Sequence, residues 1–85
     1  MKLLYVTFKN SKECEKICTK LLEKKLIACV NSFEINANFL WKGKIKKSKE
    51  VGALIKTTED NLKKVVEIIK KLHSYEIPEI IDIPC

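Results

Sequence analysis

The chain has 85 residues and a formal net charge of +6, with 46% hydrophobic and 33% charged residues. This length allows one domain, and the composition excludes a disordered tail. All 17 basic residues are lysine, so the chain lacks the planar arginine fork that usually recognises phosphate and guanine, and a nucleic-acid partner is not expected.

The amino-terminal residues do not resemble a targeting signal. Residues 1 to 8 hold one lysine and six apolar residues, which is too short for the apolar core of a signal peptide. No apolar run approaches the roughly 20 residues that span a bilayer. We therefore expect a cytoplasmic protein without a membrane partner, whose four cysteines are reduced.

The first third of the chain predicts a strand followed by an amphipathic helix. Residues 3 to 8 form an apolar run of β-forming residues, which ends where turn and capping residues begin. Asn10 and Glu13 have the spacing of a capping box. Apolar residues then recur at helical intervals at Cys14, Ile17, Cys18, Leu21 and Leu22. No C-x-x-C occurs, so we interpret the two cysteines as small core residues and not as metal ligands.

The middle of the chain predicts a long β-hairpin. From Leu26 the apolar period is two, as far as Lys42 and Gly43, which predict a tight turn. Each arm can reach about 15 residues, or about 50 Å at roughly 3.3 Å per residue, which exceeds a compact domain of this size. The hairpin must bend, bulge or project, and a projecting hairpin leaves apolar residues for a partner to cover. These residues are Phe33, Phe39 and Trp41.

The last third predicts a second helix and a final extended segment. Thr58 is the expected N-cap, and residues 77 to 84 form a segment whose prolines suit its ends or an edge. The order βαββαβ predicts an α+β, ferredoxin-like fold, with an antiparallel sheet and two helices on one face, in a single domain of residues 1–85. Closed homo-oligomerisation would cover the apolar hairpin and the sheet edges.

The residue inventory argues against catalysis. His73 is the only histidine, and no serine or cysteine lies in a recognisable nucleophile motif. The two glycines stand alone, which excludes a glycine-rich phosphate loop. Acylphosphatase-like chemistry needs an arginine, and RNA-recognition motifs need aromatic residues that E-V-G-A-L-I-K at 50–56 lacks. We expect a protein that is not an enzyme.

Four segments together resemble the CutA family of divalent-cation tolerance proteins. They read L-I-A-C-V-N at 26–31, F-L-W-K-G-K-I at 39–45, E-V-G-A-L-I-K-T at 50–57 and L-H-S-Y-E-I-P-E at 72–79. The resemblance implies a homotrimer with hairpins that wrap neighbouring subunits, and a cytoplasmic role in tolerance of copper and other divalent cations. The similar PII signalling proteins provide an alternative, a trimeric module that binds a small anionic ligand and regulates a partner protein.

The resemblance also implies site residues. It assigns a cleft between subunits to Trp41, Lys56, Tyr75 and Glu79, which together suit a small polar or anionic ligand. The alternative is that Trp41 anchors an interface while Lys56 and Glu79 form an ordinary ion pair. For a bound metal, copper or another divalent cation, the resemblance implies His73 as the ligand, and the alternative is a histidine favoured by the helix dipole.

Three departures from the family pattern are visible. A cysteine used for copper in some members corresponds to Val6, and a usual proline corresponds to Ser74. The chain also stops at Cys85, whereas most relatives continue through a segment ending in a short helix. We therefore expect the carboxy-terminal helix of the family to be absent and the six-element core to be complete.

Overall fold

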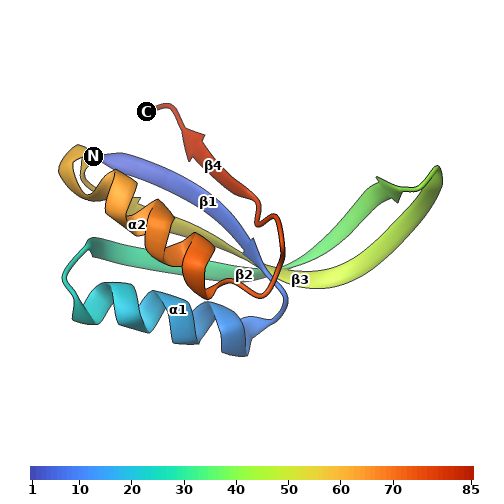
Figure 1. The fold of residues 1–85 in the computed structure, drawn as a ribbon, viewed down its shortest axis with the longest axis horizontal. Helices are drawn as coiled ribbons and strands as arrows, with labels where there is room; N and C mark the ends of the chain where they lie inside the picture. The colour runs from blue at the N-terminus through green and yellow to red at the C-terminus, as the bar shows by residue number, and fades with distance from the viewer.

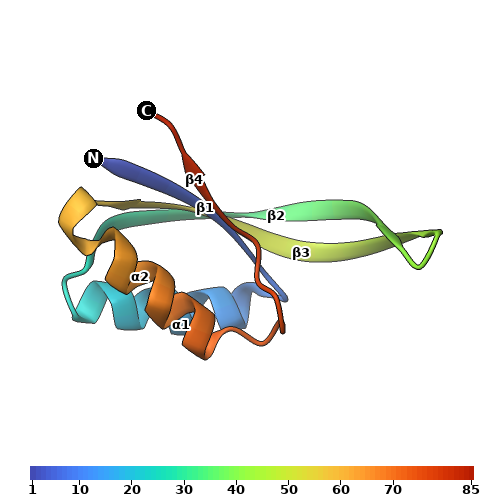
Figure 2. The same cartoon turned by 45° about the horizontal axis from the view of Figure 1, so that its top comes forward.

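The computed structural model describes all 85 residues and has the predicted order of elements. The elements are β1 (Lys2–Phe8), α1 (Ser11–Glu23), β2 (Ile27–Trp41), β3 (Lys44–Thr57), α2 (Glu59–Leu72) and β4 (Ile80–Ile83). The strands form one antiparallel sheet in the order β2-β3-β1-β4. Both helices cover the same face of this sheet (Figures 1 and 2), so the predicted α+β, ferredoxin-like fold is confirmed.

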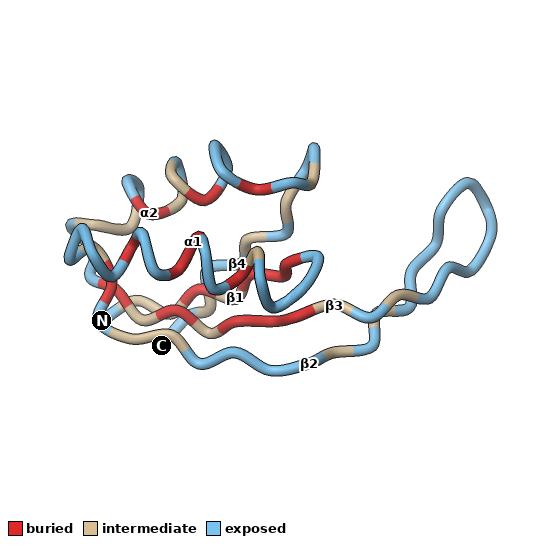
Figure 3. The backbone as a smooth tube through the Cα atoms, turned by 90° about the horizontal axis from the view of Figure 1, so that it is seen from below, coloured by how far each residue is buried: buried red, intermediate tan, exposed pale blue.

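The core lies between the two helices and the central strands β1 and β3. It contains thirteen buried hydrophobic residues. They are Leu4, Val6, Phe8, Cys14, Ile17, Cys18, Leu21, Ile27, Val51, Ala53, Ile55, Val65 and Ile69. Figure 3 shows the buried stretches on the inner sides of these elements, while the distant part of the hairpin is exposed. Cys14 and Cys18 are core residues as predicted, but Leu22 is exposed, because α1 turns it away from the sheet.

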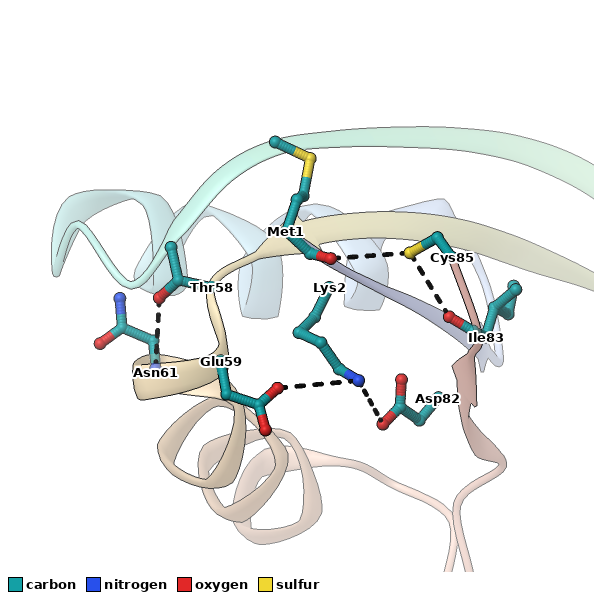
Figure 4. A network of polar contacts seen from close by, with 8 residues as sticks. All are labelled: Met1, Lys2, Thr58, Glu59, Asn61, Asp82, Ile83 and Cys85. Atoms are coloured by element: carbon teal, nitrogen blue, oxygen red, sulfur yellow. Dashed lines mark hydrogen bonds and ion pairs between the residues drawn. The ribbon is translucent and has the colours of Figure 1, made fainter.

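Both helices begin at the predicted caps. Asn10 Oδ1 accepts a hydrogen bond of 2.9 Å from the Glu13 N–H, and Thr58 Oγ1 accepts one of 3.3 Å from the Asn61 N–H (Figure 4). The capping box is only half formed, because the Glu13 carboxylate accepts from the Lys9 N–H at 3.1 Å and not from Asn10. Capping thus fixes where each helix starts relative to the strand before it.

The hairpin projects beyond the helices, as Figures 1 and 2 show. Lys42 and Gly43 have φ values of 52° and 76°, so both turn residues are left-handed, as a two-residue type I′ hairpin requires. The pairing of β1 with β3 ends at Phe8 and Val51, so residues 44–50 of β3 pair with β2 alone. The chain is consequently elongated, with extents of 40 × 26 × 21 Å.

The two ends of the chain lie side by side, at the start of β1 and just after β4. Lys2 Nζ lies 3.4 Å from an Asp82 carboxylate oxygen and 3.7 Å from one of Glu59, and the Cys85 thiol donates to the Met1 carbonyl at 3.6 Å (Figure 4). The prolines at 78 and 84 flank the short edge strand β4, as predicted. Neither helix has the length and apolar character needed to cross a membrane.

Candidate functional site

The sheet face opposite the helices has no cover in the single chain. Because successive strand residues point to opposite faces, Tyr5 and its neighbours across the sheet lie on the face away from the buried Leu4 and Val6. Large apolar residues are exposed on this face and on the hairpin. They include Phe33, Phe39, Trp41 and Ile81, with exposed fractions of 42%, 44%, 57% and 46%.

A cavity of about 510 Å³ lies where this face meets the base of the hairpin. Four segments line it: Tyr5 and Thr7 of β1, residues 35–39 of β2, Glu50 of β3, and Tyr75, Ile77 and Glu79 after α2. We call this cavity the Tyr5–Tyr75 hollow. It gathers two of the residues predicted to bind a ligand, Tyr75 and Glu79.

The charged residues of the Tyr5–Tyr75 hollow are two glutamates, Glu50 and Glu79. Burial, and then the charges of Glu79 and Glu50, raise the pKa of Tyr5. Burial, and then the charge of Glu50, raise the pKa of Tyr75. The Ser48 hydroxyl donates to Glu50 Oε2 at 2.7 Å and orients that carboxylate. Both phenols therefore remain neutral in a negative local field.

His73 positions Tyr75 in the wall of the hollow. The His73 Nδ1 atom accepts a hydrogen bond of 3.1 Å from the Tyr75 N–H, so the proton is assigned to Nε2, which donates to the Thr7 carbonyl at 2.7 Å. The imidazole is buried and stacks on Phe8, with ring centres 5.1 Å apart. The segment after α2 is thereby fixed to the end of β1.

Glu13 holds the same segment from the other side. Its Oε2 atom accepts a hydrogen bond of 3.0 Å from the Ser74 N–H. Burial works to raise the pKa of Glu13, but the hydrogen bonds from Ser74 and Lys9 outweigh it and lower that pKa. Ser74 thus provides a backbone N–H that a proline at this position would lack.

The surroundings of His73 do not fit a bound divalent ion in the single chain. Both ring nitrogens of His73 form hydrogen bonds within the protein. Val6, the position that the resemblance assigned to a copper-binding cysteine, is a buried hydrocarbon side chain. No group of three histidine, cysteine, aspartate or glutamate side chains in the structure could hold a metal ion. The predicted metal role of His73 lacks a free nitrogen, and the helix-terminal alternative agrees better with the geometry.

The other two predicted ligand residues lie away from the hollow. Lys56 is paired with Leu3 and Cys29, whereas Trp41 is paired with Lys44 at the tip of the hairpin. Lys44 and Lys56 are twelve positions apart, which corresponds to about 40 Å at roughly 3.3 Å per residue. Only different copies of the chain could bring these residues to one cleft, so the four-residue site remains a prediction.

Tyr5 and Glu50 belong to the hollow but were not predicted as site residues. The alternation of β1 indicates that Tyr5 faces away from Leu4 and Val6, and this was the available signal. Glu50 lies near Tyr5 because of the register in which β1 pairs with β3. The path of the segment after α2 places Tyr75 in the same hollow. Neither feature can be read from spacing along the chain.

A four-stranded antiparallel sheet with both helices on one face and a projecting hairpin defines an α+β protein of the ferredoxin-like class. Residues 2–85 match the family model described as CutA1 divalent ion tolerance protein, so the chain belongs to this family. A divalent-cation tolerance protein CutA from Thermotoga maritima is 50% identical over 80 residues, covering 94% of this chain and 79% of the relative. The Pyrococcus horikoshii protein of the same name is 46% identical over 83 residues, covering 98% and 81%.

Solved structures give the same result. CutA1 from Pyrococcus horikoshii matches with a TM-score of 0.94 and 44% identity, over 100% of this chain and 83% of that chain. A PII-like protein CutA from Nostoc, in apo form, matches with a TM-score of 0.92 and 28% identity, over 100% and 81%. The family resemblance read from the four sequence segments is confirmed.

Proposed function

We propose that the chain acts, without catalysing a reaction, in divalent-cation tolerance as a homotrimer that binds a small ligand at clefts between its subunits. Family membership supports the cation-tolerance role. The observation that carries the assembly is the uncovered sheet face with its projecting hairpin. Exposed apolar surface of this extent is unusual in a monomer, and burying it favours association by about 25 cal/mol per Å².

The two edges of the sheet favour a closed ring. The outer edge of β2 and that of β4 are both unpaired, and they differ in length, 15 and 4 residues. Contacts between two different edges are heterologous, and such contacts close into rings when the rotation allows it. A ring of three, which the family resemblance implies, covers both edges in every copy.

The proposed clefts combine residues from different copies. Tyr75 and Glu79 already line one hollow. Trp41 lies at the tip of the β2–β3 hairpin and Lys56 near its other end, so each is free to complete the cleft of a neighbouring copy. Copper or another divalent cation is the metal proposed for the family role. Because His73 uses both nitrogens internally, we place no ion on His73 alone.

Light scattering after size-exclusion chromatography tests the assembly. At micromolar concentration we expect three times the chain mass of 9.8 kDa. Phe39→Lys should reduce the mass, while the control Leu22→Lys, on α1 and equally exposed at 42% against 44%, should leave it unchanged. A monomeric wild type would refute the assembly and with it the intersubunit cleft.

A PII-like signalling role is the second candidate, and the similarity to the Nostoc PII-like protein CutA favours it. It differs in its ligand, a small anion such as a nucleotide, and in needing a partner protein. Calorimetry with ATP and with Cu(II), on wild type and Lys56→Ala, separates the two. Nucleotide binding that is lost in Lys56→Ala would favour signalling. A wild type that binds no nucleotide would favour the first proposal.

We also place the protein in the cytoplasm. The four cysteines are free thiols, and this compartment keeps thiols reduced. A relative from Archaeoglobus fulgidus with 40% identity is described as a periplasmic divalent cation tolerance protein. Fractionation of cells with an antibody against this chain would decide the compartment, and recovery in the periplasm would refute the placement.

A further inference from the structure

The Tyr5–Tyr75 hollow combines aromatic walls with charge of one sign. We propose that it binds the ammonium or guanidinium group of a small organic cation. This inference rests on the proposed function, because it names the ligand class of the proposed cleft. It replaces the small polar or anionic ligand expected for that cleft from the family resemblance.

The first argument is the distribution of charge. Lysine occupies 17 of 85 positions, one in five, so an average surface of eleven residues would contain about two lysines. The eleven residues that line the hollow include no lysine and two glutamates, Glu50 and Glu79. Within one chain, whose net charge is +6, the hollow therefore carries the opposite sign and favours cations over anions.

The second argument is the aromatic lining. Tyr5, Phe39 and Tyr75 come from three different segments and surround the hollow together with two isoleucines. A cation within about 6 Å of an aromatic ring is attracted by its negative face, and an apolar body beside it can bury surface. The volume of about 510 Å³ suits a small organic molecule.

The third argument is that the polar groups are already oriented. The Ser48 hydroxyl donates to Glu50 Oε2 at 2.7 Å, and the Tyr75 hydroxyl also hydrogen-bonds the Glu50 carboxylate, so this carboxylate is held in place. His73 fixes the backbone of Tyr75, and the Thr7 N–H donates to the Glu79 carbonyl at 3.4 Å. Burial, followed by the charges of the glutamates, raises the pKa of Tyr5 and of Tyr75, so both hydroxyls stay neutral and their oxygens can accept from an ammonium N–H.

A bare divalent ion suits the hollow less well. Calcium needs six to eight oxygen ligands, and magnesium needs a near-octahedral set. The hollow offers two carboxylates among aromatic and aliphatic side chains, and no metal-holding group of three side chains is found there. The chemistry of the walls therefore favours an organic cation.

Calorimetry with two ligands of similar shape and opposite charge tests the inference. Phenethylammonium should bind to the assembled wild type, and phenylacetate should not. Glu50→Gln and Glu79→Gln should each weaken phenethylammonium binding roughly five- to tenfold, because each removes a charge-assisted contact. The control Glu34→Gln, whose side chain does not line the hollow, should leave the affinity unchanged.

The aromatic contribution has its own pair of variants. Tyr75→Phe keeps the ring and should change the affinity less than Tyr75→Leu, which removes it. Equal losses in the two variants would overturn the aromatic part of the proposal. Light scattering on every variant verifies that the assembly is retained.

Other outcomes overturn the inference in distinguishable ways. Binding of phenylacetate or ATP that is strengthened in Glu79→Gln would show an anion site at the hollow and leave the proposed ligand-binding role intact. Binding of Mn(II) or Cu(II) that Glu79→Gln abolishes would show a metal site. Phenethylammonium binding only in Lys56→Ala would mean that a lysine of a second copy fills the hollow. A trimer that binds no probe refutes the inference alone, whereas a monomer refutes the proposed function.

Discussion

His73→Ala is the variant that best separates a structural histidine from a metal ligand. The imidazole is 8% exposed, and its removal deletes the hydrogen bonds to the Thr7 carbonyl and from the Tyr75 N–H. Thr7 is 5% exposed, so its carbonyl would lose its partner in a place that water reaches poorly. The stacked ring of Phe8 would also face a cavity.

The expected loss of stability follows from these contacts. Two hydrogen bonds contribute about 1 kcal/mol each, and an unsatisfied buried carbonyl costs about 1 to 2 kcal/mol more. The sum, about 3 to 4 kcal/mol, is a large part of the roughly 4 to 13 kcal/mol expected for 85 residues. His73→Gln, whose amide can still donate to Thr7, should recover about 1 kcal/mol.

Urea unfolding followed by circular dichroism measures these differences. All variants need the same protomer concentration, because the proposed assembly would add to the apparent stability. Parallel calorimetry with Cu(II) completes the test. A loss below about 1 kcal/mol in His73→Ala, together with lost copper binding, would refute the structural reasoning and establish His73 as a metal ligand.

Three further predictions concern other groups. Tyr5 and Tyr75 should titrate above 10.0 by ultraviolet absorbance, and Glu50→Gln should lower the pKa of both. Because folding raises these pKa values, the free energy of unfolding should fall as pH rises beyond 10. The pKa of Glu13 is lowered from 4.5, so its contribution is present above 4.5 and lost as pH falls through the folded value; Glu13→Gln should flatten acid unfolding there. Gly43→Ala should cost about 1 kcal/mol in urea unfolding, since φ is 76°, and Gly43→Asn should cost less.

Sequence pattern predicted the architecture because its periods are unambiguous. The alternation before Trp41 and the Lys42–Gly43 turn placed the hairpin, and Thr58 placed the start of α2. The differences are local. The final strand was expected over 77–84, but regular pairing covers only Ile80–Ile83, because the preceding segment bends over the hollow and proline cannot donate to a ladder.

The candidate site was predictable only in part, because it depends on register and on the path of a loop. Tyr75 and Glu79 lie four residues apart in one segment, and they do meet in the hollow. Tyr5 and Glu50 are 45 positions apart and come together through the pairing of β1 with β3. The negative sign of the hollow also had no signature in a chain whose overall charge is positive.

A difference in strand length explains both the hollow and the uncovered hairpin. The pairing of β1 ends opposite Val51, while β3 continues as residues 44–50 with β2 as its only neighbour. Beside Glu50 the hollow is lined by Tyr75, whereas the part of the hairpin farther out has no other strand beside it in the chain. A second copy that covers the hairpin must therefore approach the mouth of the hollow. Assembly and ligand binding should consequently be coupled. In the proposed trimer, phenethylammonium should let the chain stay assembled at lower protein concentration, and dilution to monomers should weaken phenethylammonium binding.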